Sequence, residues 1–129
     1  MRDLTPALTV FFDGACPLCR REIDHYRRRD REGRIAFVDV AADPAPLAGT
    51  GITQAQALAA MHARRADGSM VRGAAAFVAL WEQIPGWRVA ARLVRGTPGL
   101  LPLAERIYAW IAPRRSRVAA VLCRSGGCA

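Results

Sequence analysis

Residues 8–19 read Leu-Thr-Val-Phe-Phe-Asp-Gly-Ala-Cys-Pro-Leu-Cys, and this stretch decides the fold. The apolar run from Leu8 to Phe12 has the length and composition of a buried β-strand. Asp13-Gly14 is a turn signal, and Pro17 suits the first helical position, where a missing N–H costs nothing. The stretch therefore predicts a strand, a tight turn and a helix that begins at or beside Cys16.

Cys16 and Cys19 are spaced as a C-x-x-C pair, which indicates redox chemistry or metal binding. A helix N-terminus beside Cys16 favours a thiolate over a thiol, because unpaired N–H groups and the helix dipole carry partial positive charge there. Cys19, Ile23 and Tyr26 follow at steps of four and three on the core-facing stripe, which predicts a shielded thiol. The pattern favours Cys16 as the nucleophile and Cys19 as the thiol that resolves a mixed disulfide.

The length of 129 residues suits a single domain. We expect a core at about residues 7–86, a helical extension at about 87–122 and a mobile tail at 123–129. No stretch approaches the roughly 18 apolar residues of a membrane-spanning helix, and the N-terminus lacks the pattern of a signal peptide. These features predict a cytoplasmic protein, whose four cysteines are expected to be catalytic or metal-binding.

The formal net charge is +8, and all 19 basic residues are arginine. Arg27-Arg28-Arg29 ends the predicted first helix, where cations complement the negative end of the dipole. Solvated helix ends explain such clusters, and contact with phosphate groups or an anionic membrane surface is the alternative. The chain has no Gly-rich phosphate loop and no aromatic residues interleaved for base stacking. We therefore expect no nucleic-acid partner, whereas peripheral membrane contact stays open.

The order of predicted elements is βαβαββα, which is that of a thioredoxin-like α/β domain, followed by a C-terminal helical extension. The expected strands are 8–12, 35–40, 61–65 and 70–72, and the expected helices of the core are 17–29, 54–60 and 74–84. Thr53 is a candidate cap for the helix at 54–60, and Ala66 to Ser69 form a predicted hairpin turn. The extension shows an amphipathic helix at 100–111 and a shorter one at 118–122.

The segment from Phe12 to Cys19 resembles the D-G-x-C-x-x-C signature of the DCC family of thiol-disulfide oxidoreductases. The similarity extends through Phe37-Val38-Asp39, the hairpin at Asp67-Gly68, and Gly73 to Phe77. This resemblance implies a thioredoxin-like fold and thiol–disulfide exchange, and it marks Asp13 as a further residue of the family motif.

The chain also departs from thioredoxins. Pro17-Leu18 replaces the Gly-Pro pair between the cysteines, and no proline lies between Leu47 and Ile84. The cis-proline that faces the active site before the third strand of thioredoxins is therefore absent. We expect substrate docking to differ, with Pro17, Leu18 and the backbone at Gly73 as candidate substrate-binding positions.

Asp13 has two interpretations. Its carboxylate can exchange a proton with the thiols as a catalytic group, or it can turn the chain together with Gly14. His25 lies about 180° around the predicted helix from Cys16, so we expect it at the surface and exclude it as a base there.

Cys123 and Cys128 allow an alternative, a zinc-binding structural or adaptor module in which they join Cys16 and Cys19 as four thiolate ligands. A second redox pair, a relay to Cys16 and the absence of any role are also open for them. Our main prediction is a thiol–disulfide oxidoreductase with Cys16, Cys19 and Asp13 at its catalytic centre, without metal or organic cofactor. Its predicted partners are protein disulfides or a small thiol such as glutathione.

Overall fold

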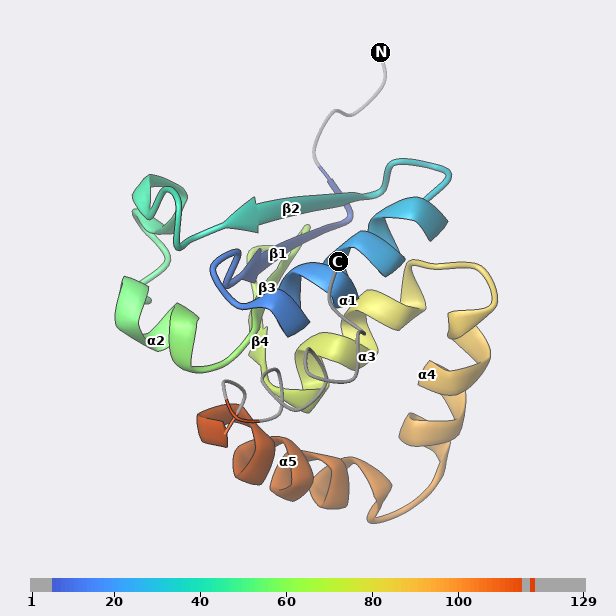
Figure 1. The fold of residues 1–129 in the computed structure, drawn as a ribbon. Helices are drawn as coiled ribbons and strands as arrows, with labels where there is room; N and C mark the ends of the chain where they lie inside the picture. Colours follow the sequence, from blue (N-terminus) through green and yellow to red (C-terminus); the bar gives the residue numbers. More distant parts are fainter. Residues whose placement is uncertain (1–5, 115–116, 118–129) are drawn as a thin grey trace.

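The elements occur in the predicted order in a computed structural model, which describes residues 6–114 and residue 117 (Figure 1). The strands are β1 (Leu8–Phe12), β2 (Ile35–Asp39), β3 (His62–Arg65) and β4 (Met70–Arg72). The α-helices are α1 (Pro17–Arg29), α2 (Gln54–Ala59), α3 (Ala74–Glu82), α4 (Trp87–Gly96) and α5 (Leu100–Ile111). Short 3₁₀ turns are η1 (Ala45–Leu47) and η2 (Ala112–Arg114). The helix predicted at 118–122 and the tail at 123–129 lie outside the described residues.

The four strands form one mixed sheet in the order β2-β1-β3-β4. β1 pairs in parallel with β2, and Phe12 lies opposite Asp39, so the two strands end side by side. β3 runs antiparallel to both β1 and β4, and the Asp67-Gly68 hairpin joins β3 to β4. This arrangement confirms the predicted thioredoxin-like α/β fold with a helical C-terminal part.

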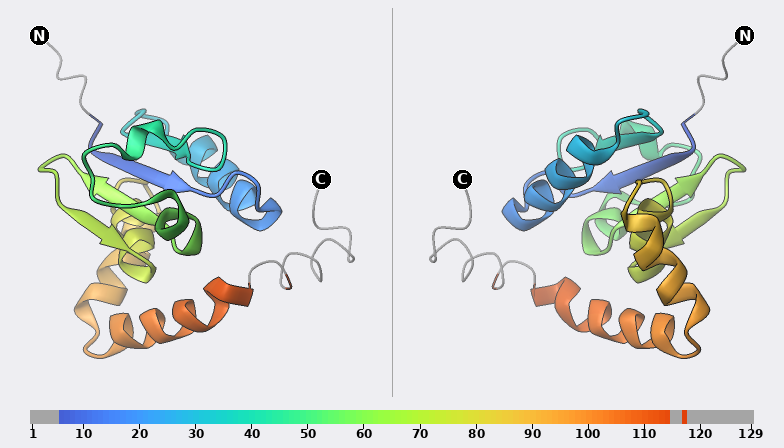
Figure 2. Two further views of the ribbon diagram at one scale, coloured as in Figure 1. Left: turned by 90° about the vertical axis from the view of Figure 1, so that its left-hand side faces the viewer. Right: turned by 90° about the vertical axis from the view of Figure 1, so that its right-hand side faces the viewer.

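Alternation along β1 divides the core into two layers, because successive strand side chains point to opposite faces. Leu8, Val10 and Phe12 pack in the larger cluster with α1 and α3. Phe11 packs on the other face with Leu47 of η1 and with α2. In the left-hand view of Figure 2, α2 and η1 accordingly lie on the viewer's side of the sheet.

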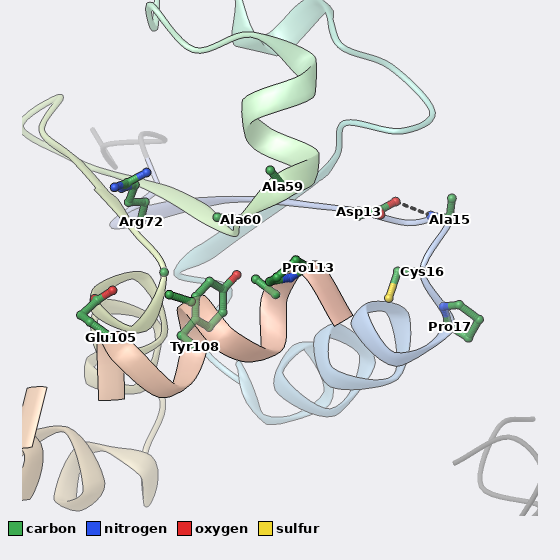
Figure 3. A pocket seen from close by; sticks show the side chains of 13 residues that line it. Asp13, Ala15, Cys16, Pro17, Ala59, Ala60, Arg72, Glu105, Tyr108 and Pro113 are labelled. Carbon is green, nitrogen blue, oxygen red and sulfur yellow. Dashed lines mark hydrogen bonds between the residues drawn. The ribbon is translucent and has the colours of Figure 1, made fainter. Parts of the chain in front are cut away.

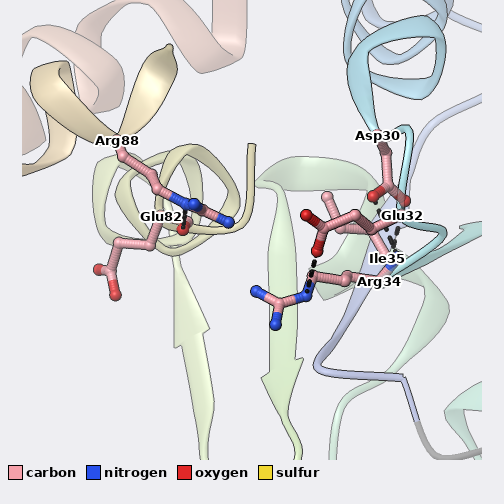
Figure 4. Close-up of polar contacts among 6 residues, drawn as sticks. All are labelled: Asp30, Glu32, Arg34, Ile35, Glu82 and Arg88. Atoms are coloured by element: carbon pink, nitrogen blue, oxygen red, sulfur yellow. Dashed lines mark hydrogen bonds and ion pairs between the residues drawn. The ribbon is translucent and has the colours of Figure 1, made fainter. Parts of the chain in front are cut away.

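Local capping explains where helices begin and end. Thr53 caps α2 as predicted: its hydroxyl accepts the Gln56 N–H, and the Gln56 side chain accepts the Thr53 N–H in return. After α1, the Asp30 carboxylate accepts the N–H groups of Arg34 and Ile35 at 3.0 Å each and so starts β2 (Figure 4). The two hydrogen bonds of Asp30 hold the turn between α1 and β2.

The two helices of the extension, α4 and α5, both pack against α3. The Arg88 guanidinium donates to the Glu82 carbonyl at 3.1 Å, which fixes the corner between α3 and α4 (Figure 4). α5 then returns across the molecule, so that its C-terminal end faces the start of α1 across a cavity that both line (Figure 2). In the part of the chain that the structure describes, each helix is too short or too polar to cross a membrane.

Candidate active site

Cys16 is the N-cap residue of α1. Its backbone is extended, with φ −84° and ψ 118°, and Pro17 occupies the first turn as predicted. The Cys16 sulfur accepts the backbone N–H of Cys19 at 3.3 Å. This N–H and the positive end of the helix dipole both lie at the sulfur, and a cysteine attacks a disulfide as its thiolate.

Cys19 lies one turn further along α1, on the same stripe as the buried Ile23 and Tyr26. Cys16 and Cys19 are both half-buried, so the predicted contrast between an open and a hidden thiol is not seen in their exposure. The two cysteines differ in their surroundings instead: Cys16 lines a cavity at the start of α1, and Cys19 is not among the residues that line it.

Asp13 forms the turn between β1 and α1. Its carboxylate accepts the Ala15 N–H at 3.0 Å, and its carbonyl accepts the Cys16 N–H at 3.2 Å. These two hydrogen bonds support the interpretation of Asp13 as a turn-forming residue. A proton-transfer role for the same carboxylate stays a prediction.

Asp39 is a site residue that sequence reasoning missed. One oxygen of its carboxylate accepts the Gly14 N–H at 2.9 Å, the Ala41 N–H at 3.0 Å and the Ala42 N–H at 3.3 Å. A Cβ on Gly14 would overlap the Asp39 carboxylate, so this close approach requires glycine. The sequence signal is indirect: an aspartate that ends the second of two parallel strands lies beside the loop that follows the first.

Cys16 opens onto a cavity of about 730 Å³ (Figure 3). One wall is the start of α1, with Cys16 and Pro17. A second combines Ala59 and Ala60 before β3 with Arg72 and Gly73 after β4, and the third is α5 and η2. Of the three predicted substrate-binding positions, Pro17 and Gly73 line this cavity. Leu18 does not, and lies half-buried on α1.

Two side chains of α5 hold it against the core. Glu105 accepts the Ala75 N–H at 2.8 Å, and the Tyr108 hydroxyl accepts the Met61 N–H at 2.7 Å. Glu105 thereby satisfies a donor in the first turn of α3, whose N-cap residue, Gly73, has no side chain to do so. Sequence reasoning placed Tyr108 only on an apolar face and did not single out Glu105.

The position directly before β3, where thioredoxins carry a cis-proline, has no proline in this chain. Ala60 and Met61 occupy this position, and the described residues contain no cis peptide bond. His62 is buried, and its Nδ1 lies 2.8 Å from the Ala60 carbonyl, so the imidazole donates there.

The zinc alternative cannot be placed in the structure, because Cys123 and Cys128 lie outside the described residues. Within residues 6–114 and at residue 117, no group of three or more His, Cys, Asp or Glu side chains is arranged to hold a metal ion.

His25 differs from expectation. It is half-buried rather than at the surface, because α4 covers it and its ring makes edge contacts with Tyr26 and Trp87. It remains away from the cavity that Cys16 lines.

Known proteins resemble this chain over most of its length. The sequence matches the family model described as DCC1-like thiol-disulfide oxidoreductase over residues 10–120. An uncharacterized chloroplastic protein of Arabidopsis thaliana is 35% identical over 83 residues, which make up 62% of this chain and 39% of that protein. The chain thus spans about two fifths of the length of this relative, and no solved structure matches. Because the family model covers well over half of the sequence, the chain belongs to the DCC1-like thiol-disulfide oxidoreductase family.

Proposed function

We propose that this protein exchanges thiols and disulfides through Cys16 and Cys19, with Cys16 as the nucleophile and Cys19 as the resolving thiol. One observation carries the proposal: the Cys16 sulfur sits at the N-terminus of α1, accepts the Cys19 N–H at 3.3 Å and lines a cavity. Membership of a thiol–disulfide oxidoreductase family supports the same reaction class.

The reaction proceeds in two exchanges. The Cys16 thiolate attacks one sulfur of a substrate disulfide, so a mixed disulfide forms while the other half leaves as a thiolate and takes up a proton. Cys19 then loses its proton and attacks the Cys16 sulfur, which releases the second half of the substrate as a thiol. The substrate gains two electrons, and Cys16 and Cys19 become a disulfide. Two equivalents of an external thiol reverse these steps and restore the dithiol.

The chain's own residues position this chemistry. Asp39 and Asp13 hold the loop before Cys16 through backbone N–H groups, so the sulfur stays at the helix end. Neither metal nor organic cofactor has a step in this scheme. The substrates are disulfides of proteins or of small thiols such as glutathione, and the proposed location is the cytoplasm.

A trapping experiment tests the assignment of roles. Cys19→Ser and Cys16→Ser are each made in a chain that also carries Cys123→Ser and Cys128→Ser, so that one thiol remains. Each is mixed with 2-hydroxyethyl disulfide, and the mixed disulfide is followed by mass spectrometry. The chain that retains Cys16 is expected to form it at least about tenfold faster at pH 7, because thiolate character sets the rate of attack.

Two results would overturn the proposal. The first is equal rates for the two single-thiol chains, which would mean that the helix end does not activate Cys16. The second is about one zinc ion per chain with all four thiols protected in the unsubstituted protein, as expected for a four-thiolate site.

A further inference from the structure

The two residues directly before β3, Ala60 and Met61, have no free backbone group with which to pair a peptide. A protein that binds an extended peptide by adding it as a strand needs unpaired N–H and C=O groups for the pairing. Ala60 donates its N–H to the Gln56 carbonyl at 3.3 Å, and its own carbonyl lies 2.8 Å from the His62 Nδ1. Met61 donates to the Tyr108 hydroxyl at 2.7 Å and accepts the Gly73 N–H at 2.9 Å. All four groups are therefore occupied.

The cavity has the size of a small-molecule site. Its volume of about 730 Å³ lies within the range of roughly 300–1,000 Å³ that is typical of pockets for small ligands. α5 forms one wall, and Glu105 and Tyr108 attach that wall to the core by bonds of 2.8 and 2.7 Å. A ligand that enters the space beside Cys16 must therefore fit between α5 and the start of α1.

The cavity lining carries one arginine, Arg72, and two carboxylates. Each carboxylate accepts a backbone N–H, Asp13 from Ala15 and Glu105 from Ala75, so Arg72 is the lining group that attracts a carboxylate. Arg72 is exposed at the rim and forms no ion pair with any residue that the structure describes. Figure 3 places Arg72 and Cys16 at opposite ends of the cavity, with the Tyr108 ring between them. A net charge of +8 also attracts anions to the protein as a whole.

We propose that the substrates are low-molecular-weight disulfides that carry a carboxylate, with the reacting sulfur at Cys16 and the carboxylate at Arg72. This inference rests on the function proposed above and selects one of its two substrate classes. Each turnover converts one small disulfide and the Cys16–Cys19 dithiol into two small thiols and the Cys16–Cys19 disulfide. Arg72 acts on binding alone and takes no part in the transfer of electrons or protons.

Three disulfide substrates test separately how the charge and the size of the substrate affect the rate. Glutathione disulfide is small and carries carboxylates, 2-hydroxyethyl disulfide is small and neutral, and insulin offers protein disulfides. Each is mixed with the reduced chain bearing Cys123→Ser and Cys128→Ser, and oxidation of the Cys16–Cys19 dithiol is followed by quenching and mass spectrometry. We expect the order glutathione disulfide, then 2-hydroxyethyl disulfide, then insulin in second-order rate constant.

Arg72→Gln is the decisive variant, and Arg28→Gln is its matched control, since Arg28 is an exposed arginine of α1 that does not line the cavity. Arg72→Gln is expected to lower the rate constant for glutathione disulfide about fivefold, as for the loss of one exposed charge pair, and to leave 2-hydroxyethyl disulfide unchanged. The control removes the same charge and is expected to change neither rate by more than about twofold. Circular dichroism of both variants verifies the fold.

The outcomes distinguish a failure of the proposed substrate preference from a failure of the proposed exchange reaction. Equal losses for the charged and the neutral disulfide, equal losses in the control, or insulin reacting as fast as glutathione disulfide would overturn this inference and leave the exchange reaction in place. Failure of all three disulfides to oxidise the dithiol would instead refute the function on which it rests.

Discussion

Replacing Gly14 by alanine is predicted to disrupt the loop that carries Cys16. The φ of Gly14 is not positive, so its backbone does not itself require glycine. The restriction is spatial, because a Cβ at this position would overlap the Asp39 carboxylate. The added methyl group must therefore push Asp39 away from the three N–H groups that it accepts.

The expected cost follows from those three hydrogen bonds. The N–H groups of Gly14 and Ala41 are partly buried, and that of Ala42 is exposed. Leaving a buried donor without a partner costs about 1–3 kcal/mol, so we expect Gly14→Ala to lower the free energy of unfolding by about 2–4 kcal/mol. Asp39→Ala removes the same acceptor and is expected to cost a similar amount.

Urea unfolding followed by tryptophan fluorescence measures both variants and the double variant. In an Asp39→Ala background the methyl group has room, so adding Gly14→Ala is expected to cost almost nothing and to give a coupling energy of about 2–4 kcal/mol. Gly96→Ala is the matched control: Gly96 ends α4 with nothing near its Cβ position, so alanine is expected to be neutral or stabilising. A coupling energy below about 0.5 kcal/mol would refute the steric argument.

Two further predictions concern the tyrosines. Burial is the main cause that raises the pKa of Tyr26 from 10.0 to about 12, so between these pH values the unfolded chain loses a proton that the native chain keeps. The free energy of unfolding should therefore fall as pH rises through this window, by at most about 1.4 kcal/mol per pH unit, and denaturant titrations should show no such contribution in Tyr26→Phe. Tyr108→Phe leaves the Met61 N–H without its acceptor and should lower the free energy of unfolding by about 1–3 kcal/mol in the same titrations; an unchanged midpoint would mean that α5 does not depend on this bond.

Elements whose signals are local were predictable from the sequence. β1 and α1 follow from an apolar run, a turn and a proline within a dozen residues, and the structure has both at the predicted bounds. The cap at Thr53 and the hairpin at Asp67-Gly68 depend on equally short spacings. Cys16 could be assigned to a helix N-terminus for the same reason, since the residues that create the helix end are its neighbours.

Contacts between distant segments were not predictable. Asp39 reaches Gly14 across 25 positions, and only the parallel register of β1 and β2 makes that contact possible. Periodicity identified an apolar face at 100–111 but not the surface on which the helix packs, so the roles of Glu105 and Tyr108 stayed hidden. His25 was misjudged on similar grounds, because α4 covers it from a part of the chain that periodicity cannot position.

The missing proline and the helical extension are physically linked. A proline has no backbone N–H, so the position before the third strand of thioredoxins needs no hydrogen-bond acceptor. Met61 occupies the position before β3 here and does carry an N–H, which would be left without a partner if nothing approached it. The Tyr108 hydroxyl supplies the acceptor at 2.7 Å, and it can do so only because α5 returns across the mouth of the site. The same helix that satisfies this backbone also forms a wall of the cavity, so the absence of the proline and the proposed preference for small substrates both agree with one packing arrangement.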